Sequence, residues 1–183
     1  MTLYLIRHGK TAANEQHLYC GSTDLPLSQQ GREELKKLHY RLDAKHFVTS
    51  GMTRTEQTLE VLFGSVAHDV QPQLREVDFG IFEMGSYDQL KDTPAYQQWL
   101  EGDNEANIPP MGESGLQMKQ RVCRAIADIK EDTVVITHGG VIAAIMEQRF
   151  PQEGKNRYQW QPKPGHGYAV QEDAYWPIPQ GLA

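Results

Sequence analysis

Two histidines, each followed by glycine, carry the most reactive chemistry in this sequence: Arg7-His8-Gly9 near the N-terminus and His138-Gly139-Gly140 further along. A histidine with an ordinary pKa of about 6.5 is largely neutral at pH 7, and neutral imidazole is a nucleophile that needs no separate base. The glycines lack a Cβ, so backbone amides can approach an anion closely. Together with Arg54, whose guanidinium matches phosphate oxygens, this set indicates a pocket for a phosphoryl group.

Predicted strands end just before these side chains. Residues 3–6 form a short apolar run and residues 133–137 a β-branched run, and each run leads to one of the two histidines. Residues 46–49 form a brief third strand, followed by a helix over 53–63 whose first turn contains Arg54. Because the carboxyl ends of parallel strands meet at one edge of a sheet, we expect the two histidines and two arginines to converge there.

Periodicity and capping predict the other elements. Ser28 is a candidate N-cap for a helix with Leu35, Leu38 and Leu42 on one face. Thr53 and Glu56 match a capping box for the helix over 53–63. The remaining expected elements are a weaker strand at 70–74 and helices at 118–129 and 141–146.

Alternating strands and helices predict an α/β fold, in which a largely parallel central sheet has helices on both faces in three α/β/α layers. The 183 residues fit one domain, spanning 1–183. Two irregular stretches, 80–115 and the tail from 151 with five of the ten prolines, are expected to form lids and walls. Aromatic residues there are candidates for a substrate wall: Phe82, Tyr87, Tyr96, Trp99, Tyr158 and Trp160.

Composition excludes several function classes. With 18 Lys plus Arg against 24 Asp plus Glu, the net charge is −6, which gives little reason to expect nucleic acid or an anionic membrane as a partner. Cys20 and Cys123 are far apart in sequence and suggest neither a disulfide framework nor a cysteine zinc site. The apolar run at the N-terminus is too short for a signal peptide or a membrane span, so we expect a cytoplasmic protein.

Four segments resemble motifs of the histidine phosphatase superfamily, also called phosphoglycerate mutase-like. Residues 5–11, Leu-Ile-Arg-His-Gly-Lys-Thr, resemble the Arg-His-Gly signature of that family, and residues 137–141 resemble its second histidine motif. Residues 50–58 resemble its second arginine motif, although Gly-Met replaces the common Pro-Leu. Residues 74–80 resemble the segment with the proton-donating carboxylate. The resemblance covers nearly the whole chain and implies a phosphoglycerate mutase-like fold.

The resemblance also implies a metal-independent phosphatase that needs no cofactor and forms a phosphohistidine on His8. Glu76 would protonate the leaving oxygen and then activate water, and the pH optimum would lie on the acidic side of neutrality. Cys20 and Gly21 would line the pocket. The implied catalytic residues are His8, Glu76, Arg7, Arg54 and His138, and the implied substrate-binding residues are Asn14, Cys20, Gly21 and Gly139.

The substrate is expected to be a small phosphorylated metabolite. Residues 79–84 and 109–114, with Trp99, look closer to the α-ribazole phosphatase branch, although Phe82 stands where tryptophan is common. Alternatives are a general phosphomonoester phosphatase, a phosphoglycerate mutase-type phosphoryl transfer, for which the chain is short, and a non-catalytic phosphate-binding module. The oligomeric state stays open.

A metal hydrolase is a further alternative. His8, His138 and Glu76 could in principle provide two imidazoles and one carboxylate for a metal ion. Two arginines in the same pocket would repel the cation, which disfavours this interpretation.

Overall fold

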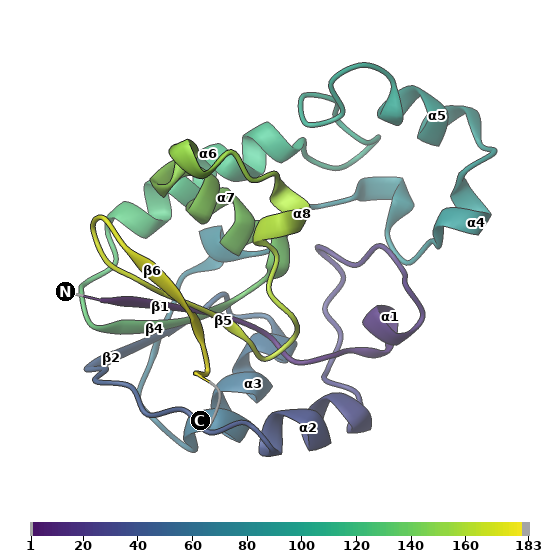
Figure 1. Cartoon of the computed structure of the whole chain (residues 1–183). Helices are drawn as coiled ribbons and strands as arrows, with labels where there is room; N and C mark the ends of the chain where they lie inside the picture. Colours follow the sequence, from purple (N-terminus) through teal and green to yellow (C-terminus); the bar gives the residue numbers. More distant parts are fainter. Residues whose placement is uncertain (1, 181–183) are drawn as a thin grey trace.

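A six-stranded sheet with the order β3-β2-β4-β1-β5-β6 forms the centre of the protein (Figure 1). The computed structural model describes residues 2–180. The strands are β1 Leu3–Arg7, β2 His46–Thr49, β3 Asp69–Val70, β4 Thr133–Thr137, β5 Gly167–Val170 and β6 Tyr175–Ile178. The α-helices are α1 Ala12–Glu15, α2 Gln29–Lys36, α3 Thr53–Phe63, α4 Tyr87–Leu90, α5 Pro94–Leu100, α6 Gly115–Ala127, α7 Gly139–Arg149 and α8 Arg157–Trp160. Short 3₁₀ turns are η1 Pro72–Leu74, η2 Gly80–Phe82 and η3 Pro151–Glu153.

The pairing of β1 with β4 places the two histidines side by side. These strands are parallel, and their register pairs Leu3 with Thr133 and Arg7 with Thr137. The residue that follows each strand is therefore a histidine at the same edge of the sheet. The strands β2 and β3 extend the parallel part beyond β4, as the sequence predicts.

Helices cover both faces of the sheet. Figure 1 shows α6 and α7 on one face and α2 and α3 on the other, while α1, α4 and α5 lie beyond the carboxyl ends of the parallel strands. Successive residues of β1 point to opposite faces, so Leu5 packs with α6 and α7 while Ile6 packs on the side of α3. This arrangement confirms the predicted three-layer α/β/α fold.

The helix α7 is buried along most of its length. Residues 139–146 are all buried, and no polar face interrupts them. A helix that is apolar all round is stable only when neighbours surround it, and here α6, α8 and the sheet do so. The predicted helix 141–146 is thus the centre of a longer element, whose N-terminus begins directly after His138.

The tail was predicted only as lid or wall, and this prediction missed its two strands. The strand β5 pairs antiparallel with β1, and β6 pairs antiparallel with β5. Gly167 explains part of the close pairing, because a Cβ there would lie 1.7 Å from the Leu5 carbonyl oxygen. The first residue and the last three of the predicted domain 1–183 lie outside the described residues.

The predicted capping box at the start of α3 is wrong. The N-cap is Met52, and its side chain makes no capping bond. Thr53 instead donates hydrogen bonds from its amide and its hydroxyl to the Asp24 carboxylate, at 2.8 and 2.9 Å. The Glu56 carboxylate accepts a hydrogen bond from Thr49 Oγ1 and lies 2.7 Å from His68 Nε2. Tertiary contacts thus replace the local cap, yet the helix still begins at Thr53 and keeps Arg54 in its first turn.

Other boundaries differ from the prediction for local reasons. Ser28 caps α2 as expected, but the helix ends at Lys36, so Leu38 and Leu42 lie outside it. Of the predicted strand 70–74, only its first residue belongs to a strand, β3, and residues 72–74 form η1. The strand does not continue because Pro72 has no amide hydrogen to donate to a neighbouring strand. The predicted helix 118–129 begins earlier and ends earlier, as α6, and the irregular stretch 80–115 includes the short helices α4 and α5.

Candidate functional site

His8 and His138 lie at the centre of the candidate site. Their ring centroids are 5.2 Å apart, and both residues are buried. His8 Nδ1 donates to the Gly9 carbonyl at 2.6 Å, which leaves the Nε2 lone pair of a neutral ring available. His138 Nε2 shares a hydrogen bond of 2.9 Å with Ser50 Oγ, while its buried Nδ1 has no partner within residues 2–180.

Burial and positive neighbours keep both rings neutral. Desolvation lowers the pKa of His8 well below 6.5, and Arg54 and Arg7 lower it further. The pKa of His138 is lowered in the same direction, first by burial and then by Arg54. A buried imidazole surrounded by guanidinium groups is therefore neutral at pH 7 and able to act as a nucleophile.

The two arginines are oriented by backbone carbonyl groups. Arg54 is buried, and its two terminal nitrogens donate to the carbonyls of Thr23 at 2.9 Å and Gly21 at 2.7 Å. Arg7 donates through one terminal nitrogen to the Pro162 carbonyl at 2.9 Å, and its buried Nε has no partner in the described part of the chain. A partly buried guanidinium with an unused donor is suited to an anion.

Glu76 lies against the N-terminus of α7. One of its carboxylate oxygens accepts from the Gly140 amide at 2.9 Å, and the other accepts from the Val77 amide at 3.0 Å. A Cβ at position 140 would lie 2.5 Å from Glu76 Oε1, so any larger residue there would displace the Glu76 carboxylate. A Cβ at Gly139 would likewise lie 3.1 Å from Arg7 Nε. The two glycines thus let a carboxylate and a guanidinium approach the start of one helix.

The loop after α1, which contains Cys20 and Gly21, supports the site through its backbone more than through its side chains. Gly21 packs so closely on the next segment that a Cβ would lie 1.6 Å from the Val77 carbonyl oxygen, and its own carbonyl holds Arg54. Cys20 Sγ donates to the Thr23 carbonyl at 3.5 Å, and burial raises the pKa of its thiol despite the opposing effect of Arg54. Cys20 is thus held as a thiol, which agrees with a packing role.

A cavity of about 460 Å³ opens beside Arg7. Lys10 and Asn14 line it together with Arg7, and Tyr19 and Tyr87 add aromatic surface. Asn14 uses its side-chain oxygen to accept from the Thr11 amide at 2.9 Å, so its side-chain NH₂ group is the part available to a ligand. Cys20 and Gly21 are not among the lining residues of this cavity.

The predicted aromatic wall is only partly present. Tyr87 lines the cavity, but Phe82, Tyr96 and Trp160 are almost fully buried and belong to the interior. Tyr19 was missed, and it joins the cavity to a packed cluster through a 2.5 Å hydrogen bond between its hydroxyl and that of Tyr96. Tyr19 directly precedes Cys20, a residue expected to line the pocket, and this position in the sequence was the only indication of its role.

A larger cavity of about 1030 Å³ lies elsewhere, between residues 37–43 and the end of β6. It contains none of the predicted site residues, and its size alone does not make it the reactive centre. In residues 2–180 no cluster of three or more His, Cys, Asp or Glu side chains could hold a metal ion. In the same range, no helix has the length and apolar character needed to cross a membrane.

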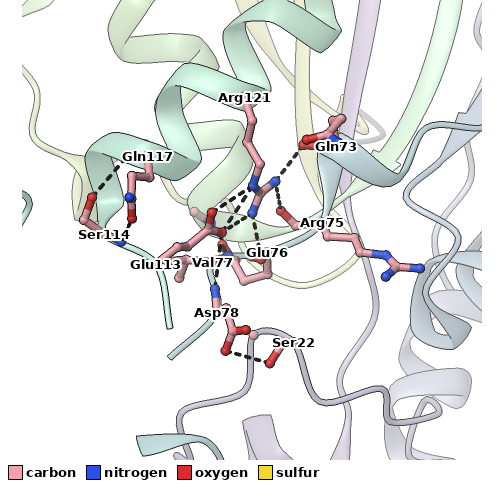
Figure 2. A network of polar contacts seen from close by, with 12 residues as sticks. Ser22, Gln73, Arg75, Glu76, Val77, Asp78, Glu113, Ser114, Gln117 and Arg121 are labelled. Carbon is pink, nitrogen blue, oxygen red and sulfur yellow. Dashed lines mark hydrogen bonds and ion pairs between the residues drawn. The ribbon is translucent and has the colours of Figure 1, made fainter. Parts of the chain in front are cut away.

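Two charged residues that sequence reasoning missed hold the loops of the site. Glu83 accepts from the amides of Gly21, Ser22, Thr23 and Phe79 at 2.9 to 3.2 Å and from the Thr23 hydroxyl at 2.7 Å. Arg121 holds the segment with Glu76 (Figure 2). A single Glu or Arg in a sequence is usually a solvated surface residue, so the sequence did not indicate that Glu83 or Arg121 supports the site.

Comparisons with known proteins agree with this geometry. A profile described as histidine phosphatase superfamily (branch 1) matches residues 3–171. The adenosylcobalamin/alpha-ribazole phosphatase of Escherichia coli (strain K12) is 34% identical over 158 residues, which cover 80% of this chain and 77% of that protein.

Solved structures share the fold. A putative alpha-ribazole-5'-P phosphatase from Escherichia coli str. K-12 substr. MG1655 has a TM-score of 0.83 and 26% identity, with 97% of this chain and 94% of that chain covered. A phosphoglycerate mutase from Thermus thermophilus has a TM-score of 0.75 and 31% identity, with 93% and 92% covered. These likenesses confirm the predicted phosphoglycerate mutase-like fold.

Proposed function

Because the chain belongs to the histidine phosphatase superfamily, we propose that it hydrolyses phosphomonoesters through a phosphohistidine on His8. One observation carries this proposal: the free Nε2 of a neutral, buried His8 lies near cationic and polar side chains whose buried nitrogens have no hydrogen-bond partner. Arg7 Nε and His138 Nδ1 are both buried and without partners in residues 2–180, and a phosphoryl oxygen would satisfy such groups.

The reaction would proceed in two displacements. His8 Nε2 attacks phosphorus, forming a P–N bond while the P–O bond to the organic group breaks, and Glu76 gives the departing oxygen a proton. Glu76 then takes a proton from water, which attacks phosphorus, breaks the P–N bond and releases inorganic phosphate. Arg7, Arg54 and His138 would hold the charge on the phosphoryl oxygens throughout, with Asn14 and the Gly139 amide completing the set.

The substrate is a small phosphorylated metabolite, and α-ribazole 5'-phosphate is the first compound to test. A cavity of about 460 Å³ admits a small organic group, and Tyr19 and Tyr87 give it aromatic surface. The Escherichia coli relative that is 34% identical carries this activity in its name. Both cysteines are free thiols, which is consistent with the proposed location in the reducing cytoplasm.

Phosphoryl transfer of the mutase type is the second candidate. The Thermus thermophilus structure is described as a phosphoglycerate mutase, and it is 31% identical. Lys10 in the cavity lining could bind a second acidic group such as the carboxylate of phosphoglycerate. A mutase would return the phosphoryl group from His8 to a second substrate oxygen instead of to water.

The test is steady-state hydrolysis of α-ribazole 5'-phosphate, 3-phosphoglycerate and p-nitrophenyl phosphate, with His8→Ala protein as control. Phosphate release that depends on His8 supports the hydrolase, and one substrate preferred by several orders of magnitude identifies its metabolite. Isomerisation of 3-phosphoglycerate without phosphate release would support the mutase. No reaction with any compound would favour the binding module.

A further inference from the structure

The segment that carries Glu76 is not part of the sheet. It follows the short turn η1 and runs irregularly to η2. A catalytic carboxylate on such a segment needs some other support, since no strand pairing fixes its backbone. Figure 2 shows that Arg121, from the middle of α6, reaches across to this segment.

Arg121 gathers three carbonyl groups of the segment around one guanidinium. One terminal nitrogen donates to the carbonyls of Gln73 at 2.6 Å and Arg75 at 2.8 Å, and the other donates to the carbonyl of Glu76 at 3.0 Å. These carbonyls converge on one guanidinium, whose planar set of donors satisfies all three at once.

Glu113 holds both the Arg121 guanidinium and the backbone of Asp78, two residues after Glu76. Its carboxylate accepts from Arg121 Nε at 3.1 and 3.2 Å and pairs with the terminal nitrogen that also serves Glu76. Glu113 also accepts from the Asp78 amide at 3.3 Å and donates its own amide to the Asp78 carbonyl at 2.9 Å. Both side chains are about four-fifths buried, so solvent screens the pair only partly.

We propose that Arg121 is the positioning residue of the proton donor. By holding the backbone of Glu76, it keeps the Glu76 carboxylate against the Gly140 amide at the start of α7. This inference rests on the proposed function, because it assigns Arg121 to the step in which Glu76 gives up its proton. A displacement of about 1 Å at a reacting group can cost on the order of 100-fold in rate.

The test compares two leaving groups. An alkyl phosphate needs a proton on its departing oxygen, whereas p-nitrophenolate leaves without one, so only the first depends on Glu76. The quantity is kcat/KM, which reports the steps up to departure of the leaving group. Arg121→Met should lower kcat/KM roughly 10- to 100-fold for the alkyl phosphate and less than about threefold for p-nitrophenyl phosphate. Arg124→Met, at an exposed arginine of the same helix, should change neither.

A double variant asks whether Arg121 acts through Glu76. In Glu76→Gln protein, the further change Arg121→Met should lower kcat/KM for the alkyl phosphate by less than about twofold, because the group it positions is already disabled. Arg121→Lys should restore part of the activity, since a lysine supplies donors but lacks the planar fork. If Arg121→Met does not fold, Arg121→Lys and Glu113→Gln provide the same comparison.

The outcomes separate the two proposals. Equal slowing of both substrates in Arg121→Met, or additive losses in the double variant, would overturn the positioning role while leaving the phosphatase intact. A wild-type protein that hydrolyses no phosphomonoester would overturn the proposed function and the role of Arg121 with it. Slowing confined to the alkyl phosphate and absent from the Glu76→Gln background supports the inference.

Discussion

The two halves of the site are held in different ways. His8 and His138 follow β1 and β4, so strand pairing and a buried core on both faces fix them. Glu76 lies on an irregular segment, and Arg54 is oriented by the carbonyls of the loop at residues 21–23. Neither of these supporting segments belongs to a strand of the sheet.

Each loop instead depends on one charged side chain. Arg121 satisfies carbonyl groups around Glu76, and Glu83 satisfies the amides of residues 21–23. Hydrogen bonds to a charged partner are about twice as strong as neutral ones, so a single ion can order a segment that lacks regular structure. In the strand-borne half, His8 and His138, a substitution should remove chemistry. In the loop-borne half, Glu76 and the loop that orients Arg54, activity should also fall when Arg121 or Glu83 is changed, because the reactive groups are then displaced.

The largest effect is expected at the strand-borne half. His8→Ala removes the nucleophile, so turnover should fall by at least about 10⁴-fold, as happens when a covalent nucleophile is deleted. Folding should be little affected, and circular dichroism serves as the control. Turnover close to wild type in this variant would remove His8 from the role of nucleophile.

Glu76→Gln should come next. The amide cannot give a proton, so kcat/KM for an alkyl phosphate should fall about 10²- to 10⁴-fold, the usual value of general acid catalysis. With p-nitrophenyl phosphate the loss should be much smaller, because that leaving group needs no proton. Similar losses for both substrates would argue that Glu76 has a different task.

A smaller effect is expected from Glu83→Gln. The amide keeps one acceptor oxygen but places an NH₂ group among the donors of residues 21–23, which should loosen the carbonyls that orient Arg54. The inhibition constant of inorganic phosphate should rise roughly tenfold, about the worth of one hydrogen bond to a charged group. Glu101→Gln, at an exposed position, is the matched control and should leave it unchanged. Unchanged phosphate binding in Glu83→Gln would show that the loop does not need this carboxylate.

The pH dependence should be milder still. Because burial and the arginines lower the pKa of His8, its nucleophilic neutral form persists at pH values well below 6.5. The acid limb due to His8 thus lies below pH 6.5, and because the leaving oxygen must gain a proton, we expect the optimum on the acidic side of neutrality. NMR titration of the His8 ring should give a midpoint clearly below 6.5. A midpoint at or above that value, or a flat rate profile from pH 5 to 9, would contradict this electrostatic description.

Chelation is expected to have no effect. The reaction as proposed uses the donors of Arg7, Arg54 and His138 in place of a cation. Activity measured after dialysis against EDTA should equal that of untreated protein. Loss of activity that returns with added metal would favour the alternative in which His8, His138 and Glu76 bind an ion.

The sequence predicted the strand-borne half more fully than the loop-borne half. Short apolar runs before His8 and His138 mark buried strands directly, and their parallel pairing follows from the alternation of strands and helices. Glu76 was found only through the family motif, because an irregular segment has no periodicity. The role of Arg121 depends on contacts between residues 45 or more positions apart, which a single sequence does not encode in any local pattern.

Local rules also failed where tertiary contacts competed with them. Thr53 had the right spacing for a cap, but Asp24 offered its hydroxyl and amide a stronger partner. The strands β5 and β6 were missed because the proline-rich tail looked irregular, and Pro177 in β6 is tolerated since that strand lies at the edge of the sheet.

The most direct test of the central claim is to trap the phosphoenzyme. Rapid acid-free quenching of Glu76→Gln protein during turnover of p-nitrophenyl phosphate, followed by peptide mass spectrometry, should find the phosphoryl group on His8, because attack proceeds with this leaving group while water activation is slowed. The modification should be acid-labile and absent from His8→Ala protein. Hydrolysis that continues with no phosphoryl group on His8, or with the group on another residue, would contradict the account.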